Sequence, residues 1–211
     1  MKKMFTPKDF FDLSAFDFSD IFKDAKFVWE PIGGIQNYII GLFKTGRLKP
    51  NYGKNIFIGK DTLVEDYAVI KGPAIIGKNC FIGHASYLRG GCILGDNVHI
   101  GHGAEIKNSI LLNNAIAAHL NYIGDSIIGS NVNISGGAML ANFRFDKKSV
   151  TIKTENKRID TGLSKFGAIL GDNSTIGVNA VLNPGTLLGK NTIVYPLTSV
   201  KGVHKDGEVI R

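Results

Sequence analysis

Aliphatic residues recur at every sixth position along most of the chain, and this spacing limits the folds that it can adopt. From residue 56 the third place of successive six-residue units holds Ile58, Val64, Ile70, Ile76, Ile82, Leu88, Leu94, Ile100, Ile106, Leu112 and Ala118. The register slips by two residues after His119, then resumes at Ile128, Ile134 and Leu140, and later at Leu170, Ile176, Leu182, Leu188, Val194 and Val200. An amphipathic helix repeats about every 3.6 residues and a strand about every 2, so neither fits.

The spacing fits very short strands joined by tight turns, with one aliphatic side chain pointing inward from each strand. Gly or Asn commonly follows the aliphatic residue and supplies the backbone freedom that a tight turn needs. One such unit cannot bury its apolar residue alone, so the units must stack into a coil. The sequence therefore predicts an all-β repeat protein, a parallel β-helix. An ordinary sandwich of short strands is the alternative, but so many in-phase positions disfavour it.

The flanking segments are not repeats. Residues 1–50 are rich in aromatic residues, with a helix start at Thr6-Pro7 and a second helix expected from about Ile35 to Phe43. We expect these aromatic side chains to pack against the base of the coil or a neighbouring subunit, with docking of another protein as the alternative. The repeat domain covers 51–203 and is interrupted by a basic loop, 144–165, extruded from the coil. The polar tail, 204–211, is expected to fray.

The charge and composition of the chain limit the kinds of ligand that we expect it to bind. The loop 144–165 holds seven basic and three acidic residues, which is +4 of the net charge of +7 and suits a phosphate-bearing small molecule. Aromatic residues do not alternate with the basic ones, which argues against nucleic acid. No apolar run of about 18 residues or signal-peptide pattern occurs, so we expect no membrane span and a cytoplasmic location. Cys80 and Cys92 are expected to be reduced and semi-buried.

Two cations, Arg89 and Lys107, are separated by 18 residues, and each follows an inward aliphatic residue. If three units make one turn of the coil, they lie one above the other, about 4.8 Å apart. The next layer brings Tyr122 and Ile123. We expect Arg89, Lys107 and Tyr122 to form a column that grips a phosphate. The alternative is that two surface cations share this spacing by accident.

The histidine at the register slip, His119, is the candidate general base. Its ordinary pKa of about 6.5 suits proton abstraction near neutral pH. We interpret the remaining histidines as surface turn residues: His84, His99, His102 and His204. A β-helical zinc enzyme would need three histidines, two of them about one short strand apart. No histidine follows within five residues of His119, so we expect no metal.

Five segments together resemble the glucosamine-1-phosphate N-acetyltransferase domain of the bifunctional enzyme that makes UDP-N-acetylglucosamine. They are Arg89, 105–109 (EIKNS), 119–126 (HLNYIGDS), 129–134 (GSNVNI) and 141–142 (AN). The resemblance is close over 51–143 and looser over 166–203. It implies a left-handed parallel β-helix, a homotrimer with sites between subunits, and acetyl-CoA as co-substrate.

The resemblance also implies roles for single residues. By the family pattern His119 removes a proton from the sugar amine, Asn142 lies near the amine and acetyl group, and the Gly136 N–H supplies an oxyanion donor. Phosphate-binding positions match Arg89, Lys107, Tyr122 and, from the loop, Lys148. Asn133 matches a sugar contact. Gly136 and Val178 match positions that meet CoA, although the family often has serine where this chain has Val178, and tyrosine where it has Phe143.

The function that we expect is acetyl transfer from acetyl-CoA to an amino-sugar 1-phosphate, most simply glucosamine 1-phosphate, in UDP-N-acetylglucosamine biosynthesis. No glycine-rich nucleotidyltransferase loop precedes residue 51, so we expect no nucleotidyltransferase activity from this chain. Two alternatives remain. The acceptor is another amino sugar or a nucleotide-amino-sugar, or the chain is a non-catalytic β-helix that binds a separate nucleotidyltransferase.

Overall fold

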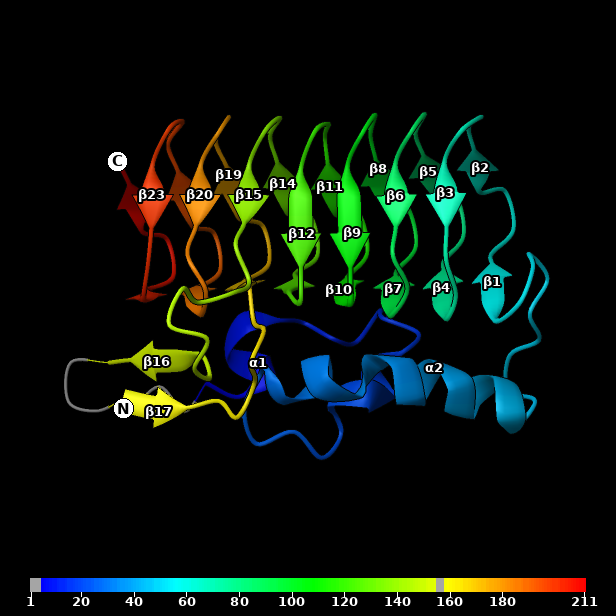
Figure 1. Ribbon diagram of the computed structural model, residues 1–211, viewed down its shortest axis with the longest axis horizontal. Coiled ribbons are helices and arrows are strands. Elements are labelled where there is room, and N and C mark those ends of the chain that lie inside the picture. The colour runs from blue at the N-terminus through cyan, green and yellow to red at the C-terminus, as the bar shows by residue number, and fades with distance from the viewer. Residues whose placement is uncertain (1–4, 155–157) are drawn as a thin grey trace.

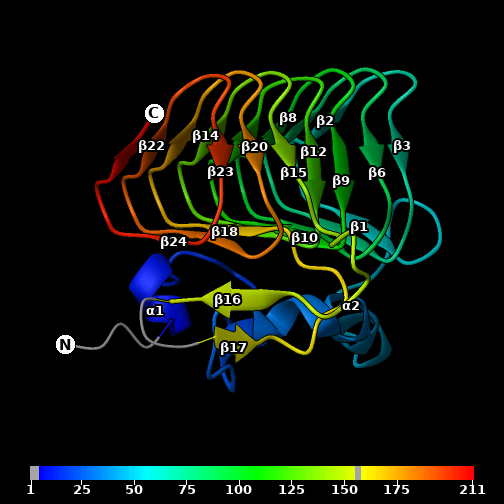
Figure 2. The same ribbon diagram turned by 60° about the vertical axis from the view of Figure 1, so that its left-hand side comes forward.

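Three parallel sheets wind into one coil in the computed structural model, which describes residues 5–154 and 158–211 (Figures 1 and 2). The strands of the first sheet are, in spatial order, β1 (Ile56–Ile58), β4 (Ala74–Ile76), β7 (Cys92–Leu94), β10 (Ser109–Leu111), β13 (Ile127–Ile128), β18 (Ala168–Leu170), β21 (Thr186–Leu188) and β24 (Val203–His204). Every third strand of the coil joins the same sheet, so each turn of the coil contributes one strand to each of its three sides.

The second sheet contains β2 (Leu63–Val64), β5 (Phe81–Ile82), β8 (His99–Ile100), β11 (Ile116–Ala117), β14 (Asn133–Ile134), β19 (Thr175–Ile176), β22 (Ile193–Val194) and β25 (Val209–Ile210). The third contains β3 (Val69–Ile70), β6 (Tyr87–Leu88), β9 (Glu105–Lys107), β12 (Tyr122–Gly124), β15 (Met139–Leu140), β20 (Val181–Leu182) and β23 (Ser199–Val200). Leu88 lies beside Ile106, which confirms that three six-residue units make one turn.

The register of the repeat shortens in two places rather than slipping once. The coil interior holds Leu111 and Ala117, not the expected Leu112 and Ala118. The inward residues are therefore five apart from Ile106 to Leu111, and again five apart between residues 123 and 128. Both shortened turns join the third sheet to the first. The expectation that the register breaks at His119 is wrong, because the spacing on either side of it is regular.

Asparagine supplies most of the tight turns at the corner that joins the first sheet to the second. Residues with positive φ recur there once in each turn of the coil: Asp61, Asn79, Asn97, Asn114, Asn131, Asn173, Asn191 and Gly207. Asparagine tolerates this left-handed conformation better than most side chains do. The Nδ2 of Asn114 donates to Oδ1 of Asn131 at 3.0 Å, and Asn131 donates in the same way to Asn173.

The N-terminal region lies along the outer face of the first sheet, not at the base of the coil as expected (Figures 1 and 2). Its elements are α1 (Pro7–Phe10), η1 (Ser19–Phe22), η2 (Glu30–Gly34) and α2 (Ile35–Lys44). The two expected helix starts are confirmed, and Thr6 and Asp9 form a capping box before α1. Between α1 and α2 the chain forms the two short 3-10 helices η1 and η2.

Aromatic side chains join this region to the first sheet. Trp29 is buried, stacks on Phe27 with ring centroids 4.7 Å apart, and contacts Phe166 at 6.2 Å. The outward residues of the first sheet, such as Ile93 and Ile169, belong to the same apolar cluster. These three-residue strands are therefore buried on both faces, whereas strands of the other two sheets alternate between buried and more exposed positions.

The inserted segment is more ordered than an extruded loop. It carries the antiparallel pair β16 (Thr151–Lys153) and β17 (Arg158–Asp160), which lies beside the N-terminal region (Figure 1). Val150 and Ile152 are buried there, and two of the charges counted in this segment, at 155 and 157, lie outside the described residues.

Three further expectations can be compared with the fold. The expected fraying of 204–211 is wrong, because β25 continues the second sheet beyond β22. Cys80 and Cys92 are free and buried, and burial raises the pKa of Cys92 to about 12. None of the helices in the described residues has the length and apolar character that crossing a bilayer requires.

Replacing Trp29 tests whether the N-terminal region is integral to the fold. We expect Trp29→Ala to lower the free energy of unfolding by about 3–5 kcal/mol, because the cavity would lie between the first sheet and its cover. Urea denaturation measures this change. Lys60→Ala, which removes a side chain that is 85% exposed, is the control, and a loss as small as the control's would contradict an integral role.

Candidate functional site

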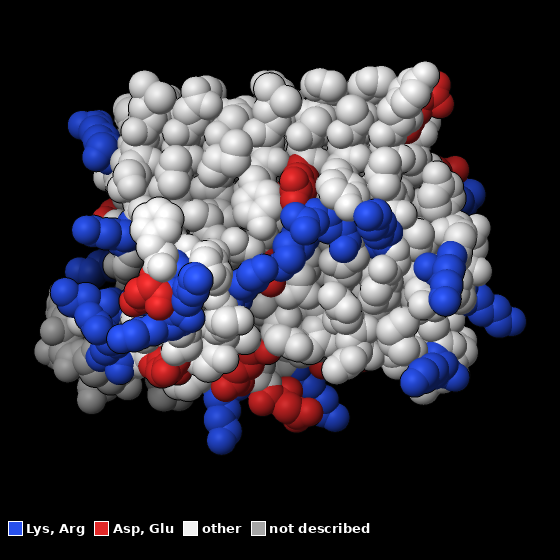
Figure 3. Space-filling model, viewed as in Figure 1, with Lys and Arg blue, Asp and Glu red and all other residues white. Residues whose placement is uncertain are grey.

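The two predicted cations lie one above the other at the end of the third sheet, as expected. The Arg89 N–H donates to the Ile106 carbonyl, which places Arg89 beside Lys107 on the next turn of the coil. Lys71 precedes them in the same column. Figure 3 shows basic side chains crossing this face in a band. The column therefore offers positive charge to an anion on this face.

Each of the two cations is paired with a carboxylate. An Arg89 guanidinium nitrogen lies 2.7 Å from Oε1 of Glu105, and Nζ of Lys107 lies 2.7 Å from Oδ2 of Asp125. The first pair is partly exposed, whereas the second is mostly buried. These carboxylates relieve the repulsion between stacked cations.

The phenol of Tyr122 does not complete this column. Tyr122 lies on the expected turn of the coil, but its neighbour is Glu105, and Gly124 lies beside Lys107. Residues 105 and 107 both point outward from β9, so the face carries two parallel columns rather than one. Tyr122 belongs to the column of Glu105, next to the cations.

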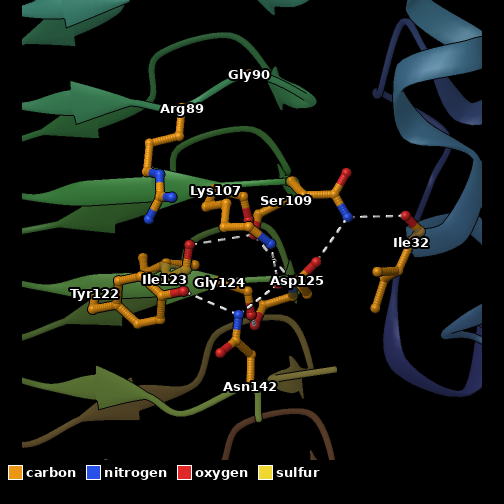
Figure 4. Close-up of polar contacts among 12 residues, drawn as sticks. Ile32, Arg89, Gly90, Lys107, Ser109, Tyr122, Ile123, Gly124, Asp125 and Asn142 are labelled. Atoms are coloured by element: carbon orange, nitrogen blue, oxygen red, sulfur yellow. Dashed lines mark hydrogen bonds and ion pairs between the residues drawn. The ribbon is translucent and has the colours of Figure 1, made fainter. Parts of the chain in front are cut away.

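Asp125 is the hub of the cluster (Figure 4). Its side chain is about 6% exposed and accepts three side-chain hydrogen bonds. Oδ2 receives Lys107 Nζ at 2.7 Å and Asn142 Nδ2 at 2.5 Å, and Oδ1 receives Asn108 Nδ2 at 3.0 Å. Both Asn108 and Asp125 have positive φ and occupy the two shortened turns. Shortening the corner thus brings these two side chains together.

A glycine allows Tyr122 and Asn142 to meet. Asn142 Nδ2 also donates to the Tyr122 hydroxyl oxygen at 3.0 Å, directly over Gly124. A Cβ on Gly124 would lie 2.5 Å from that oxygen and 2.6 Å from Asn142 Nδ2, so no larger residue fits without displacing both. Burial, followed by the charge of Asp125, raises the pKa of Tyr122, so the phenol stays protonated at neutral pH.

The imidazole of His119 lies at the opposite corner, between the second and third sheets. His119 is exposed, and its Nε2 would lie 2.5 Å from a Cβ placed on Gly136. Glycine at 136 thus gives the imidazole room. Among the described residues the Gly136 N–H has no hydrogen-bond acceptor.

Other predicted residues lie at this corner or near it. Val178 follows Gly136 on the next turn, and it is 48% exposed. Asn133 is on the second sheet, beside Ile116 and Thr175, and so faces away from the cation column. The exposed Lys148 has no ion pair with a described residue. One chain therefore brings together Arg89, Lys107, Tyr122 and Asn142, with His119, Gly136 and Val178 at a second corner, and it leaves Asn133 and Lys148 apart.

Several residues of the site were not found from the sequence. Asp125, Asn108 and Gly124 lie within the motifs that resemble the family, but a six-residue repeat did not single them out. His84 and His102 occupy the same corner as His119 on the two preceding turns, with ring centroids 5.6 Å apart. The spacings of 18 and 17 residues could have revealed this column. Across the described residues no group of three or more His, Cys, Asp or Glu side chains could hold a metal ion.

A cavity of about 430 Å³ adjoins the hub between α2 and the segment that follows β17. Asn108 and Asp125 line it together with Gln36 and Lys165, whereas Lys107, Tyr122 and His119 do not. The cation column and His119 therefore lie outside this cavity.

Two segments of the chain match models of known protein families. Residues 70–162 match the family model described as GMPPB C-terminal domain, and residues 167–195 match the hexapeptide repeat of succinyl-transferase. The chain is therefore similar to hexapeptide-repeat proteins, although neither matched segment reaches half of its length. The first matched segment ends within the insertion, and the second begins just after it.

Individual relatives of this hexapeptide-repeat protein include a bifunctional sugar-1-phosphate nucleotidylyltransferase/acetyltransferase from Sulfurisphaera tokodaii. It is 38% identical over 42% of this chain and 22% of its own length. The bifunctional protein GlmU of Wigglesworthia glossinidia brevipalpis is 30% identical over 94% of this chain and 40% of its own length. The alignments therefore span less than half of either relative.

Among solved structures, AntD, an N-acyltransferase from Bacillus cereus in complex with dTDP and 3-hydroxybutyryl-CoA, is 20% identical to this chain. The match covers 72% of this chain and 76% of AntD, with a TM-score of 0.35. At that TM-score the likeness assigns no ligand position here.

The titration of Tyr122 tests the hub directly. Asp125→Asn removes the negative charge beside the phenol, so we expect the raised pKa of Tyr122 to fall toward its ordinary value of about 10. The ring signals of Tyr122, identified with Tyr122→Phe, can be followed by NMR from about pH 8 to 12. Asp172→Asn, which neutralises a carboxyl at another corner, is the control. An unchanged Tyr122 titration in Asp125→Asn would contradict the contact.

Proposed function

We propose that this chain is an acetyl-CoA-dependent N-acetyltransferase whose acceptor is an amino-sugar 1-phosphate, with glucosamine 1-phosphate as the best fit. The observation that carries the proposal is the placement of an exposed imidazole and a cation column at the two ends of one strand, β12. Because the amine and phosphate of this acceptor are vicinal, we propose that it binds between the cation column of one subunit and His119 of a neighbouring subunit. The similarity to GlmU proteins supports the same assignment.

The chemistry needs one proton transfer and one developing oxyanion. Nε2 of His119 takes a proton from the acceptor amine as the amine nitrogen attacks the thioester carbonyl of acetyl-CoA. The free Gly136 N–H donates to the oxygen on which negative charge develops. The tetrahedral intermediate then collapses, the C–S bond breaks, and the imidazolium returns a proton to the CoA sulfur. Val178, exposed on the next turn, is proposed to contact CoA.

Phosphate binding would replace the ion pair between Arg89 and Glu105. A bound phosphate would compete with Glu105 for the Arg89 guanidinium, whose surface pair is the weaker of the two. The hydroxyl of Tyr122 already accepts a hydrogen bond from Asn142, so its own hydrogen is free to donate to a phosphate oxygen. Lys107 stays held by Asp125 and contributes charge from a fixed position.

A homotrimer with sites between subunits is part of the proposal. Large apolar side chains are exposed at the corner of the second and third sheets: Tyr67, Leu120, Val178 and Leu197. Exposed apolar surface of this extent favours association with another protein surface. A neighbouring copy would also bring Asn133 or Lys148 to the acceptor, which one chain does not do. A cytoplasmic location, where acetyl-CoA is available, completes the proposal.

Two other functions compete with this one. A nucleotide-amino-sugar acceptor would use the same base and would extend along the cation column toward Lys71. A non-catalytic partner of a nucleotidyltransferase would have no physical need for the Gly136 cradle that seats His119. The aromatic N-terminal residues, moreover, pack on this chain's own first sheet and are not free to dock another protein.

The decisive experiment measures release of CoA thiol from acetyl-CoA with glucosamine 1-phosphate as acceptor. We expect turnover by the wild type and a fall of about 10²-fold or more in kcat for His119→Ala, because the base is lost. His204→Ala, on β24 of the first sheet and away from this corner, is the control and should remain active. A folded wild type that shows no turnover with any amino-sugar phosphate would reject the proposal.

The oligomeric state has its own test. Leu120→Asp places a charge at the exposed apolar corner. Leu120 has positive φ, and aspartate tolerates this conformation. We expect light scattering to show a trimer for the wild type and dissociation for Leu120→Asp. Asn191→Asp, at an exposed position with similar φ on another corner, should leave the trimer intact. A monomeric wild type would reject the shared-site arrangement.

A further inference from the structure

The side chain of Asp125 sets the orientation of the Asn142 amide as well as the position of the Lys107 ammonium. An ionised carboxylate can only accept hydrogen bonds, so the group of Asn142 that faces it must be the Nδ2 donor and not Oδ1. Figure 4 shows the Asn142 oxygen turned away from Asp125. Among the described residues Oδ1 of Asn142 has no hydrogen-bond donor, and it is not among the buried unpaired atoms. It is therefore an acceptor available to a ligand.

The same choice sets the polarity of Tyr122. Asn142 Nδ2 donates to the phenol oxygen at 3.0 Å, which leaves the hydroxyl hydrogen to point outward. If the Asn142 amide were reversed, its oxygen would accept from the phenol instead. The face would then lose an outward donor at Tyr122 and an outward acceptor at Asn142. One buried carboxylate thus decides which groups on this face donate and which accept.

The hub is also tied to the N-terminal region. Asn108 Nδ2 lies 3.1 Å from the Ile32 carbonyl oxygen and 3.0 Å from Asp125 Oδ1. Ile32 belongs to η2, just before α2. This is a continuous set of hydrogen bonds from the N-terminal region, through Asn108 and Asp125, to Asn142.

We propose that Asp125 is a positioning residue for acetyl transfer: it orients the Asn142 amide so that Oδ1 accepts from the attacking amine, and Asn108 anchors it to the N-terminal region. This inference rests on the proposed function. Asp125 touches neither the substrate nor the reacting atoms, and it acts through Asn142 and Tyr122. In the proposed site between subunits, the amine N–H that is not transferred to a neighbouring subunit's His119 would donate to Asn142 Oδ1, which would hold the nitrogen lone pair toward the thioester.

The test is steady-state kinetics of Asp125→Asn with glucosamine 1-phosphate and acetyl-CoA. The substituted amide can face Asn142 in either sense, so we expect kcat to fall by about 10- to 100-fold through misplacement of the amine. KM for the acceptor should change less than kcat, because the charge that Lys107 gains offsets weaker donation from Tyr122 to the phosphate. A merely structural role would instead lower the melting temperature without this separation of kcat from KM.

A double-variant cycle separates action through Asn142 from an independent effect. Asp125→Asn should lower kcat much less in an Asn142→Ala background than in the wild type, because the two residues act as one unit. Effects on kcat that multiply independently would overturn the inference. So would a kcat for Asp125→Asn within about twofold of the wild type, since misplacement should cost at least tenfold.

The control variant is Asp172→Asn. Asp172 is also buried and ties the N-terminal region to the coil, through Asp12 N–H at 2.6 Å and Ser130 N–H at 2.8 Å, but at a different corner. It should affect stability and leave kcat unchanged.

If Asp125→Asn does not fold, Asn108→Gly keeps the positive φ and removes one hydrogen bond to Asp125. It should give a smaller fall in kcat, and no fall would overturn the inference. An inactive wild type would remove the proposed function itself, whereas an active wild type with a fully active Asp125→Asn would remove only this inference.

Discussion

A strand of two or three residues buries only one or two side chains toward the coil interior, and every other feature of this chain depends on that limit. Such a strand is not stable alone, so each turn needs parallel partners above and below it. Stacking in register places equivalent residues one above another, as Leu88 and Ile106 show. It also stacks their outward neighbours, which is why Arg89 and Lys107 share a column. The repeat that creates the core thus also creates the surface on which the site is built.

The three sides of the coil have different roles because the chain covers one of them. The N-terminal aromatic residues and the insertion bury the outer face of the first sheet, so its outward residues became part of a second core. The corner between the other two sheets keeps exposed apolar residues and His119. Covering the first sheet leaves the remaining two sides as the surfaces where substrate and a second subunit are proposed to bind.

The spacing of six was sufficient to predict the coil, the stacking of Arg89 on Lys107 and the turn that carries Tyr122. It was not sufficient to place the register changes, because Leu111 and Leu112 are equally apolar and only the strand pairing decides which one points inward. For the same reason the sequence placed Tyr122 one step from its true column. The position of the N-terminal region was not predictable, since aromatic residues suit the end of a coil as well as its side. Asp125 escaped notice because its partners are separated from it in sequence and converge only at the shortened corner.

That shortened corner explains why a buried carboxylate is found in a site that is expected to bind phosphate. Burying Asp125 has a desolvation cost, which its bond to Lys107 and two amide donors offsets. A phosphate can displace a surface carboxylate such as Glu105 from its cation. Displacing Asp125 would leave one cation and two amide groups unpaired in a poorly solvated position. The two acidic residues therefore differ in function although both pair with the column. In the proposed site, Glu105 would neutralise Arg89 until an anion binds, and Asp125 would keep the geometry of Lys107 and Asn142 the same before and after binding.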